Sequence, residues 1–218
     1  MKEDQVQQDL ASIRSLMERS SKFISLSGLS GILAGVYALI GAGWACSIVY
    51  TRPVNKLMPV RGLFYDYDSN EGFSYDHLPI IIRLLAIALV VLVASVATGF
   101  LLSRRKAKRN GQTFWGPSSK ALLFNMIVPL LTGGALMFIF VLRGHFGIVA
   151  PASLIFYGLA LIGAGNYTFK GVQYLGINEI ILGLIAALFP GYGLLLWAIG
   201  FGVLHIIYGS VMYIKYDR

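Results

Sequence analysis

Residues 78–109 read LPIIIRLLAIALVVLVASVATGFLLSRRKAKR, an apolar run followed by a dense basic block. The apolar part, Leu78–Leu102, exceeds the ~20 residues with which an α-helix crosses the ~30 Å hydrocarbon core of a bilayer. Five other stretches share this character, so the sequence predicts six transmembrane helices. In chain order, the predicted spans are Ile24–Tyr50, Leu78–Leu102, Ala121–Leu142, Phe146–Asn166, Gly171–Phe189 and Gly191–Ile214.

The composition leaves little of the chain outside these helices. Of the 218 residues, 56% are hydrophobic and only 13% are charged, and the six stretches take up most of the length. We therefore expect an all-α polytopic membrane protein, with one transmembrane domain over 24–214 and no separate soluble domain. A cytoplasmic amphipathic helix over 1–23 and an external loop over 51–77 complete the predicted organisation.

The basic block directly after the second span accounts for much of the net charge of +8. In this position, basic residues set the topology of a membrane protein and contact anionic headgroups. We therefore expect membrane lipids as partners and no direct contact with nucleic acid. The block consists of Arg104, Arg105, Lys106, Lys108 and Arg109.

The distribution of Lys and Arg along the chain predicts the orientation in the membrane. If both termini are cytoplasmic, the inner segments carry 13 of these residues and the outer connections carry four. This asymmetry is the one that the positive-inside rule describes. The sequence thus predicts a multi-pass protein of the bacterial inner membrane with both termini in the cytoplasm.

The first 23 residues have the pattern of a water-soluble helix. Val6, Leu10, Ile13 and Met17 recur at spacings of four, three and four, which are the seam positions of a heptad. A helix this short needs another surface to be stable. One interpretation is that these four residues dock a cytosolic partner or a second copy of the chain. The alternative is a helix that lies on the membrane surface or under its own bundle.

The glycines of the chain recur at regular spacings inside the apolar stretches. Gly31 and Gly35 are four residues apart, and two further pairs are seven apart. Small residues on one face allow membrane helices to approach closely, so we expect helix contacts at these positions, with hinges or a ligand groove as the alternative. The glycines predicted to pack helices are Gly31, Gly35, Gly183, Gly193, Gly200, Gly202 and Gly209.

Four polar residues are expected at similar depths within the spans. Glu179 and His205 lie 11 and 15 residues from Pro190 on adjacent antiparallel helices, so their depths differ by about one helical turn. Asn125 falls near the depth of His205, and Tyr208 shares a helix face with His205. A carboxylate inside the bilayer is costly unless it faces a partner or a watery cavity. These residues are predicted to form a cluster that binds a proton, a cation or a small ligand, or alternatively a structural hydrogen-bond network.

The hexapeptide ALIGAG occurs twice, at 38–43 in the first span and at 160–165 in the fourth. If the match reflects a duplication, two triplets of spans run in opposite senses, as in transporters with 3+3 inverted repeats. Small and apolar residues dominate every membrane helix, so a chance match is the alternative.

Sequence motifs typical of enzymes are absent. The chain has no HExxH, no GxSxG and no P-loop. His77, His145 and His205 lie far apart, and the single Cys46 excludes both an intramolecular disulfide and a multi-cysteine metal site. We therefore expect no catalytic residues, no cofactor and no bound metal.

Several segments resemble those of a known group of proteins. They are ERSSKFISLSGLSG at 18–31, YLG at 174–176, EIILGL at 179–184 and GFGVLHIIYG at 200–209. On these motifs the chain resembles a family of small six-span bacterial inner-membrane proteins that are often encoded beside a winged-helix transcription regulator. The resemblance implies no particular activity, but it implies a cytosolic winged-helix regulator as a partner.

The heptad pattern next to a glycine-rich span, together with Glu179, favours a non-enzymatic sensor or anchor. In this hypothesis the protein signals to a cytosolic partner through its N-terminal helix. Two alternatives remain. A small secondary transporter would use Glu179 as a site in the middle of the membrane. A structural subunit, in a homo-oligomer or a larger membrane complex, would use its glycine faces to bind other spans.

Overall fold

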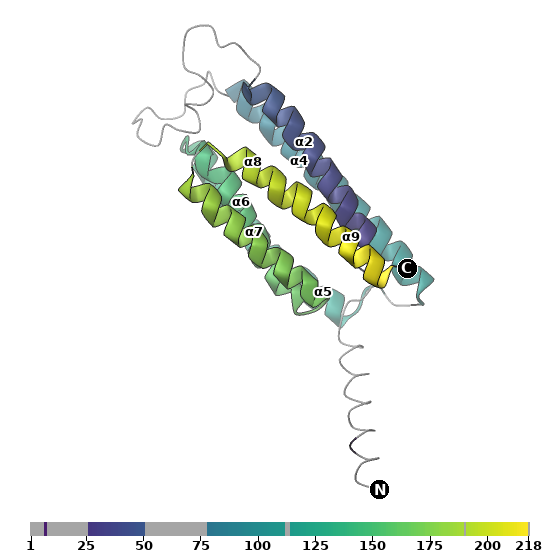
Figure 1. Ribbon diagram of the computed structural model, residues 1–218. Helices are drawn as coiled ribbons and strands as arrows, with labels where there is room; N and C mark the ends of the chain where they lie inside the picture. Colours follow the sequence, from purple (N-terminus) through teal and green to yellow (C-terminus); the bar gives the residue numbers. More distant parts are fainter. Residues whose placement is uncertain (1–6, 8–25, 51–77, 112–113, 190, 218) are drawn as a thin grey trace, which may run out of the picture.

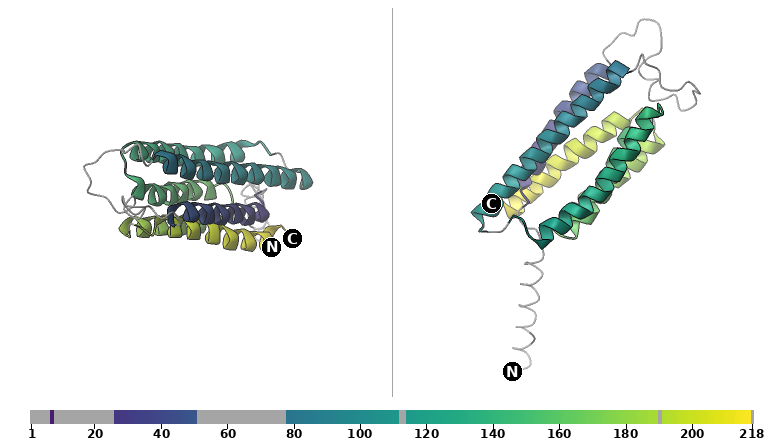
Figure 2. Two further views of the ribbon diagram at one scale, coloured as in Figure 1. Left: turned by 90° about the horizontal axis from the view of Figure 1, so that it is seen from above. Right: turned by 180° about the vertical axis from the view of Figure 1, so that it is seen from behind.

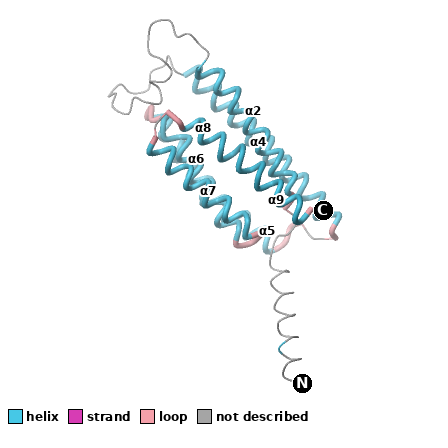
Figure 3. Tube along the Cα trace, viewed as in Figure 1, coloured by secondary structure: helices cyan, strands magenta, loops and turns pink. Residues whose placement is uncertain are grey.

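The computed structural model describes residues 7, 26–50, 78–111, 114–189 and 191–217. Within these ranges the chain forms helices, turns and bends, and no strand (Figure 3). In this described part of the chain, six helices are long and apolar enough to cross a membrane, which confirms the prediction of an all-α protein with six spans. The heptad residues of the predicted N-terminal helix and the loop over 51–77 lie outside the described residues.

The first five spans are regular helices. They are α2 (Gly28–Tyr50), α4 (Leu78–Arg109), α5 (Pro117–Leu142), α6 (Val149–Gly165) and α7 (Lys170–Leu188), and a 3-10 turn (Phe146–Ile148) precedes α6. Helix α4 continues past its apolar run through the whole basic block. Basic residues in a last turn suit the negative end of the helix dipole, which stabilises this extension.

The sixth span is divided into three parts. Helix α8 (Gly193–Trp197) leads into a π-helical segment (Ala198–Leu204), and α9 (His205–Tyr216) completes the span. A π-helix has hydrogen bonds from residue i to i+5 and is rare in proteins. The hydropathy pattern of the sequence predicts the span but not this irregularity.

The helices run side by side in one elongated bundle (Figure 1; Figure 2). Helix α2 packs most extensively on α9 and α4, whereas α6 packs on α7 and α5. The sixth span lies between these two groups and contacts both α2 and α7. Although α7 and α8 are joined by a short turn, the last span makes its largest contact with α2, because the glycines of the two helices face each other.

The closest helix contacts are made by backbone against backbone. A Cβ atom added to Gly35 of α2 would lie 2.6 Å from the carbonyl oxygen of Gly202. A Cβ atom on Gly158 of α6 would likewise lie 2.5 Å from the carbonyl oxygen of Gly176 on α7. Real Cβ atoms do not approach other atoms so closely, so glycine is required where these helices cross.

The other glycines predicted to pack helices also lie near neighbouring elements. A Cβ atom on Gly31 would lie 3.1 Å from Gly209 Cα, and one on Gly209 would lie 2.5 Å from the backbone nitrogen of Ile32. Gly183 approaches the carbonyl oxygen of Pro151, and Gly193 approaches Ala150. Gly200 faces a side chain instead of a backbone.

The two ALIGAG hexapeptides have different neighbours. Gly41, in the first copy, faces Ile87 and Val91 of α4, the next span along the chain. The corresponding Gly163 faces Asn125 of α5, the preceding span. In a 3+3 repeat that equates α2 with α6 and α4 with α7, Gly163 would face α7. The packing therefore gives the hexapeptide match no support.

One end of the bundle carries most of the described basic residues, and we call it the basic end. It holds the start of α2, the end of α4, the start of α5 and the end of α9 (Figure 1). Of the described Lys and Arg residues, Arg83 and Arg143 belong to the opposite end. Between the two ends, α4 and α5 expose large apolar side chains along their length, as lipid-facing helices do.

Candidate functional site

Glu179 is the tenth residue of α7 and is completely buried, with 0% of its surface exposed. In the described part of the chain, neither carboxylate oxygen has a hydrogen-bond partner. An ionisable group, His205, lies beside it, with its Nδ1 3.4 Å from Glu179 Oε1. The structure therefore brings together the two residues that the sequence places at similar depth.

His205, the first residue of α9, is itself buried and has polar neighbours at both ring nitrogens. Its Nδ1 lies 3.1 Å from the carbonyl oxygen of Gly200, and its Nε2 lies 2.8 Å from the hydroxyl oxygen of Tyr157 on α6. A carbonyl oxygen can only accept, so this hydrogen bond requires the proton on Nδ1. In the neutral ring, Nε2 then accepts the hydroxyl proton of Tyr157.

The π-helical segment shapes this arrangement. It ends directly before His205 and contains Gly200, so the ring reaches the carbonyl oxygen five residues earlier in the chain. Such segments interrupt regular helices and occur frequently at functional sites. Irregular backbone at membrane depth requires protein or water around it, and α2 and α7 both pack against this segment.

Gly200 provides the space that the Glu179 carboxyl group occupies. A Cβ atom at this position would collide with Glu179 Oε2 and would lie 2.6 Å from Leu154 Cδ2. The sequence predicts a helix contact at Gly200 from its spacing. In the structure, its missing side chain makes room for the buried acid.

Aromatic rings enclose the histidine. The ring of Phe201 stacks on that of His205 at an interplanar angle of 16°, and Phe201 also lies 4.9 Å from Tyr157 between ring centroids. Trp197 covers Phe201 from the other end of the π-helical segment, again at 4.9 Å. We call Tyr157, Glu179, Gly200 and His205 the buried cluster.

Tyr208 and Asn125, the other predicted members, have different positions. The ring of Tyr208 lies beside Gly171 at the start of α7, with its hydroxyl oxygen buried and without a partner in the described residues. Asn125 makes other contacts: its amide nitrogen donates to the carbonyl oxygen of Ala121 in its own helix, and its Cβ faces Gly163. Depth along a helix does not determine which face carries a side chain, so similar depth alone does not bring Asn125 to His205.

Tyr157 is a cluster residue that the sequence reasoning missed. It lies in the middle of the fourth span, away from the interfacial belts in which tyrosine is common. A hydroxyl group at that depth needs a hydrogen-bond partner. The position of Tyr157 in the middle of the span is the sequence feature that indicates a buried hydrogen bond.

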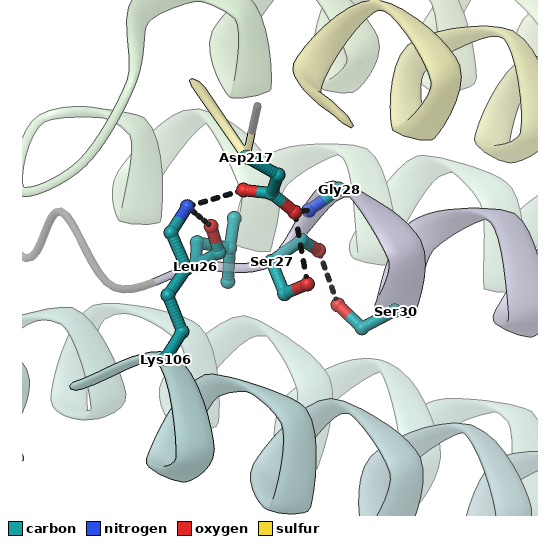
Figure 4. A network of polar contacts seen from close by, with 6 residues as sticks. All are labelled: Leu26, Ser27, Gly28, Ser30, Lys106 and Asp217. Atoms are coloured by element: carbon teal, nitrogen blue, oxygen red, sulfur yellow. Dashed lines mark hydrogen bonds and ion pairs between the residues drawn. The ribbon is translucent and has the colours of Figure 1, made fainter. Parts of the chain in front are cut away.

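A second polar centre lies at the basic end and joins three helices (Figure 4). Asp217, directly after α9, accepts hydrogen bonds at Oδ2 from the backbone nitrogen of Gly28 at 2.8 Å and from Ser27 Oγ at 3.0 Å. Lys106 of α4 forms an ion pair with Asp217 Oδ1 and donates to the carbonyl oxygen of Leu26 at 2.9 Å. We call these five residues the terminal network.

The terminal network favours the charged form of Asp217. Partial burial raises the pKa of this carboxyl group, but the hydrogen bond and charge of Lys106 lower it, as do hydrogen bonds from Ser27 and Gly28. The net result is a pKa below the ordinary value for aspartate. Carboxylates at helix N-termini are also favoured by the helix dipole, and Asp217 occupies this position at α2.

Within the basic block, Lys106 alone belongs to the terminal network. Arg104, Arg105, Lys108 and Arg109 are exposed, whereas Lys106 turns inward to Asp217. The four exposed residues are free of this network and fit the predicted contact with lipid headgroups. The residues predicted to dock a partner, Val6, Leu10, Ile13 and Met17, lie outside the described ranges.

Within the described ranges, no group of three or more His, Cys, Asp or Glu residues could hold a metal ion. Compared with protein-family models, curated proteins and solved structures, the chain matches none of them.

Proposed function

We propose that this multi-pass membrane protein is a non-enzymatic sensor whose signal is the protonation of the buried cluster. The observation that carries the proposal is Glu179, which is completely buried, has neither oxygen hydrogen-bonded in the described part of the chain, and lies 3.4 Å from His205. Ionisable residues inside a membrane protein are expensive and usually functional.

A proton changes the forces within this cluster more than any neutral ligand of similar size. An ionised Glu179 beside a protonated His205 is an ion pair in a medium of low dielectric constant, whereas a single charge there is poorly solvated. A signal shifts a conformational equilibrium only if it binds two states with different affinity. A cluster whose charge balance depends on one proton meets this requirement.

Helix α9 provides the connection from the buried cluster to the basic end. It begins at His205 and ends at Tyr216, and its 12 residues span about 18 Å. The following residue, Asp217, binds Ser27 and Gly28, where the chain enters α2. A displacement of α9 at the cluster therefore reaches the segment that precedes α2.

The proposal places the basic end in the cytoplasm of a bacterial cell, in accordance with the positive-inside rule. The segment before α2 then lies in the cytoplasm, where its heptad residues bind a partner. The resemblance described above suggests a winged-helix regulator as that partner. In this hypothesis, the state of the buried cluster determines whether the segment is presented to the regulator.

A small secondary transporter is the second candidate. The observation that favours it is the interruption of the sixth span next to Glu179, since transporters bind substrates where their helices are discontinuous near the middle of the membrane. Reconstituted protein separates the two functions. A transporter produces a flux of protons or solute across vesicles, whereas a sensor does not.

The test uses Trp197, whose ring lies 4.9 Å from Phe201 beside His205. In a Trp44→Phe, Trp115→Phe background, Trp197 is the only tryptophan. We expect its emission in lipid nanodiscs to follow a sigmoidal pH titration, which Glu179→Gln abolishes because the variant cannot lose a proton. The matched control is Asn178→Gln at the exposed neighbouring position, which should titrate as the parent does. A Glu179→Gln protein that titrates normally contradicts the proposal.

A further inference from the structure

Three buried side-chain atoms have no hydrogen-bond partner in the described part of the chain, and all lie on α7 or α9. They are Glu179 Oε1, Glu179 Oε2 and the hydroxyl oxygen of Tyr208. Buried polar atoms are almost always hydrogen-bonded, to protein or to ordered water. The lack of a protein partner at these atoms indicates that water molecules bind beside them, since water satisfies such groups at buried sites.

The polar groups form a series along the bundle. Glu179 lies beside His205, and Nε2 of the neutral His205 ring accepts a hydrogen bond from the hydroxyl group of Tyr157. Tyr208 follows three residues later on the same face of α9, with its ring against Gly171. Gly171 is eight residues before Glu179 on α7, or about 12 Å along the helix axis. The series therefore leads from the middle of the bundle toward the basic end.

The tyrosines extend this series toward solvent. Tyr157 and Tyr208 both pack against the apolar cluster of Leu161, Val172 and Leu175. Beyond Tyr208, the exposed Lys170 begins α7 at the basic end. Groups that exchange protons are thus present from the buried acid to the surface.

No such series leads from Glu179 to the opposite end through the described residues. Besides the opposite half of α2, whose Cys46 and Ser47 are exposed, the segments packed around that half are 149–156, 180–188 and 193–204, and none of these three contains an ionisable side chain. Their one hydroxyl group, that of Ser153, donates to the carbonyl oxygen of Ala150 in its own helix. The polar groups are therefore on one side of Glu179 only.

We propose that Glu179 exchanges its proton with the basic end alone, through His205, Tyr157 and water held at Tyr208. This inference rests on the proposed function and assigns its signal to one side of the membrane. The titratable groups beside Glu179 are His205 from α9, whose Nδ1 lies 3.4 Å from Oε1, and Tyr157 from α6, which is hydrogen-bonded to His205. Helix α8 and the π-helical segment contribute none.

The relay conserves atoms and charge. A hydronium ion at the basic end gives a proton to the water at Tyr208, which protonates the Tyr157 oxygen as the Tyr157 hydroxyl proton moves to His205 Nε2. The Nδ1 proton then passes from the resulting imidazolium to Glu179 Oε1. The products are a neutral Glu179, a neutral histidine protonated on Nε2 and a water molecule. Release of the proton along the same path in reverse, with Glu179 returning it to Nδ1 and Nε2 returning a proton to the Tyr157 oxygen, restores the starting tautomer.

The experiment measures from which side the buried cluster responds. The full chain, carrying Trp197 as its only tryptophan and a C-terminal affinity tag, is reconstituted into phosphatidylethanolamine and phosphatidylglycerol vesicles. Vesicles with the basic end outward are isolated through the tag and separated from the others. After a jump in external pH, we expect a fast Trp197 response only in the isolated fraction.

Two variants test the relay itself. Tyr157→Phe and Tyr208→Phe should each slow the response about 100-fold, a magnitude typical of a lost proton-transfer group, with the same emission at equilibrium. The control is Tyr213→Phe, an exposed tyrosine on the same helix, which should leave the rate unchanged. A merely structural role for the two tyrosines would alter the equilibrium emission and not selectively the rate.

The outcomes separate this inference from the proposed function. If Glu179→Gln is silent but both orientations respond equally fast, or both phenylalanine variants keep the normal rate, the relay is wrong and the sensor stands. Loss of the equilibrium response in both phenylalanine variants would also overturn the relay. A response that persists in Glu179→Gln would overturn the sensor as well.

Discussion

At the scale of single residues, the arrangement of the buried cluster depends on the absence of a side chain at Gly200. Gly200 has no Cβ, and the Glu179 carboxyl group occupies the resulting space beside Leu154. The same residue supplies the carbonyl oxygen that fixes the proton on His205 Nδ1. One glycine therefore controls both the position of the acid and the tautomer of the histidine.

Replacement of Gly200 by alanine should destabilise the protein. The new methyl group overlaps Glu179 Oε2, and overpacking of a buried site costs about 1–3 kcal/mol. Thermal unfolding in detergent measures the effect. Gly134→Ala is the control, because a Cβ there meets nothing within 4 Å and alanine favours the helix over glycine by about 1 kcal/mol. Equal behaviour of the two variants would contradict this role of Gly200.

At the scale of secondary-structure elements, Asp217 joins the end of α9 to the start of α2 and, through Lys106, to the end of α4. The carboxylate caps the N-terminus of a helix that is distant in sequence. Capping of this kind normally comes from a residue beside the helix. Here it makes the ends of three spans interdependent.

Removal of this charge should lower the stability near neutral pH. Asp217→Asn weakens hydrogen bonds to a charged acceptor, with an expected cost on the order of 1–2 kcal/mol after allowance for partial exposure. The folded-state pKa of Asp217 is below its ordinary value, so its contribution is present above the unfolded-state pKa and is lost as pH falls through the folded-state pKa.

Unfolding measured against pH checks this prediction. The parent should exceed Asp217→Asn in stability at neutral pH, and the two proteins should converge in strong acid. Lys108→Gln serves as the control, since Lys108 is exposed on the same turn of α4 and should change stability little. A constant difference between parent and variant across the whole pH range would exclude ionisation of Asp217 as the cause.

The helices also show which features of the fold can be predicted from the sequence and which cannot. Hydropathy predicts all six spans, because a membrane helix must be apolar for its whole length. The number of residues from Pro190 to Glu179 and to His205 predicts that these two side chains lie at similar depth. The π-helical segment could not be predicted, because its apolar sequence, AIGFGVL, has no pattern that distinguishes a π-helix from an α-helix. The inward turn of Lys106 depends on Asp217, which is 111 residues away.

At the scale of the whole molecule, the two ends of the bundle differ in charge. This difference predicts a fixed orientation, which single cysteines in a Cys46→Ser background can test. Arg143→Cys at the opposite end should react with a membrane-impermeant maleimide in intact spheroplasts. Asn110→Cys, in the exposed turn after α4, should react only after the membrane is permeabilised. The reverse pattern would place the basic end outside.

The contact between α2 and α9 also has a consequence for biogenesis. Among the six spans, α2 is synthesised first and α9 last, and the hydrogen bond from Gly28 to Asp217 joins residues 189 positions apart. The glycine face of α2 therefore lacks its contact with the last span until the ribosome has completed that span. A chain that terminates before Gly202 leaves this face without its partner, so an incomplete protein exposes to lipid a glycine surface that the finished protein buries.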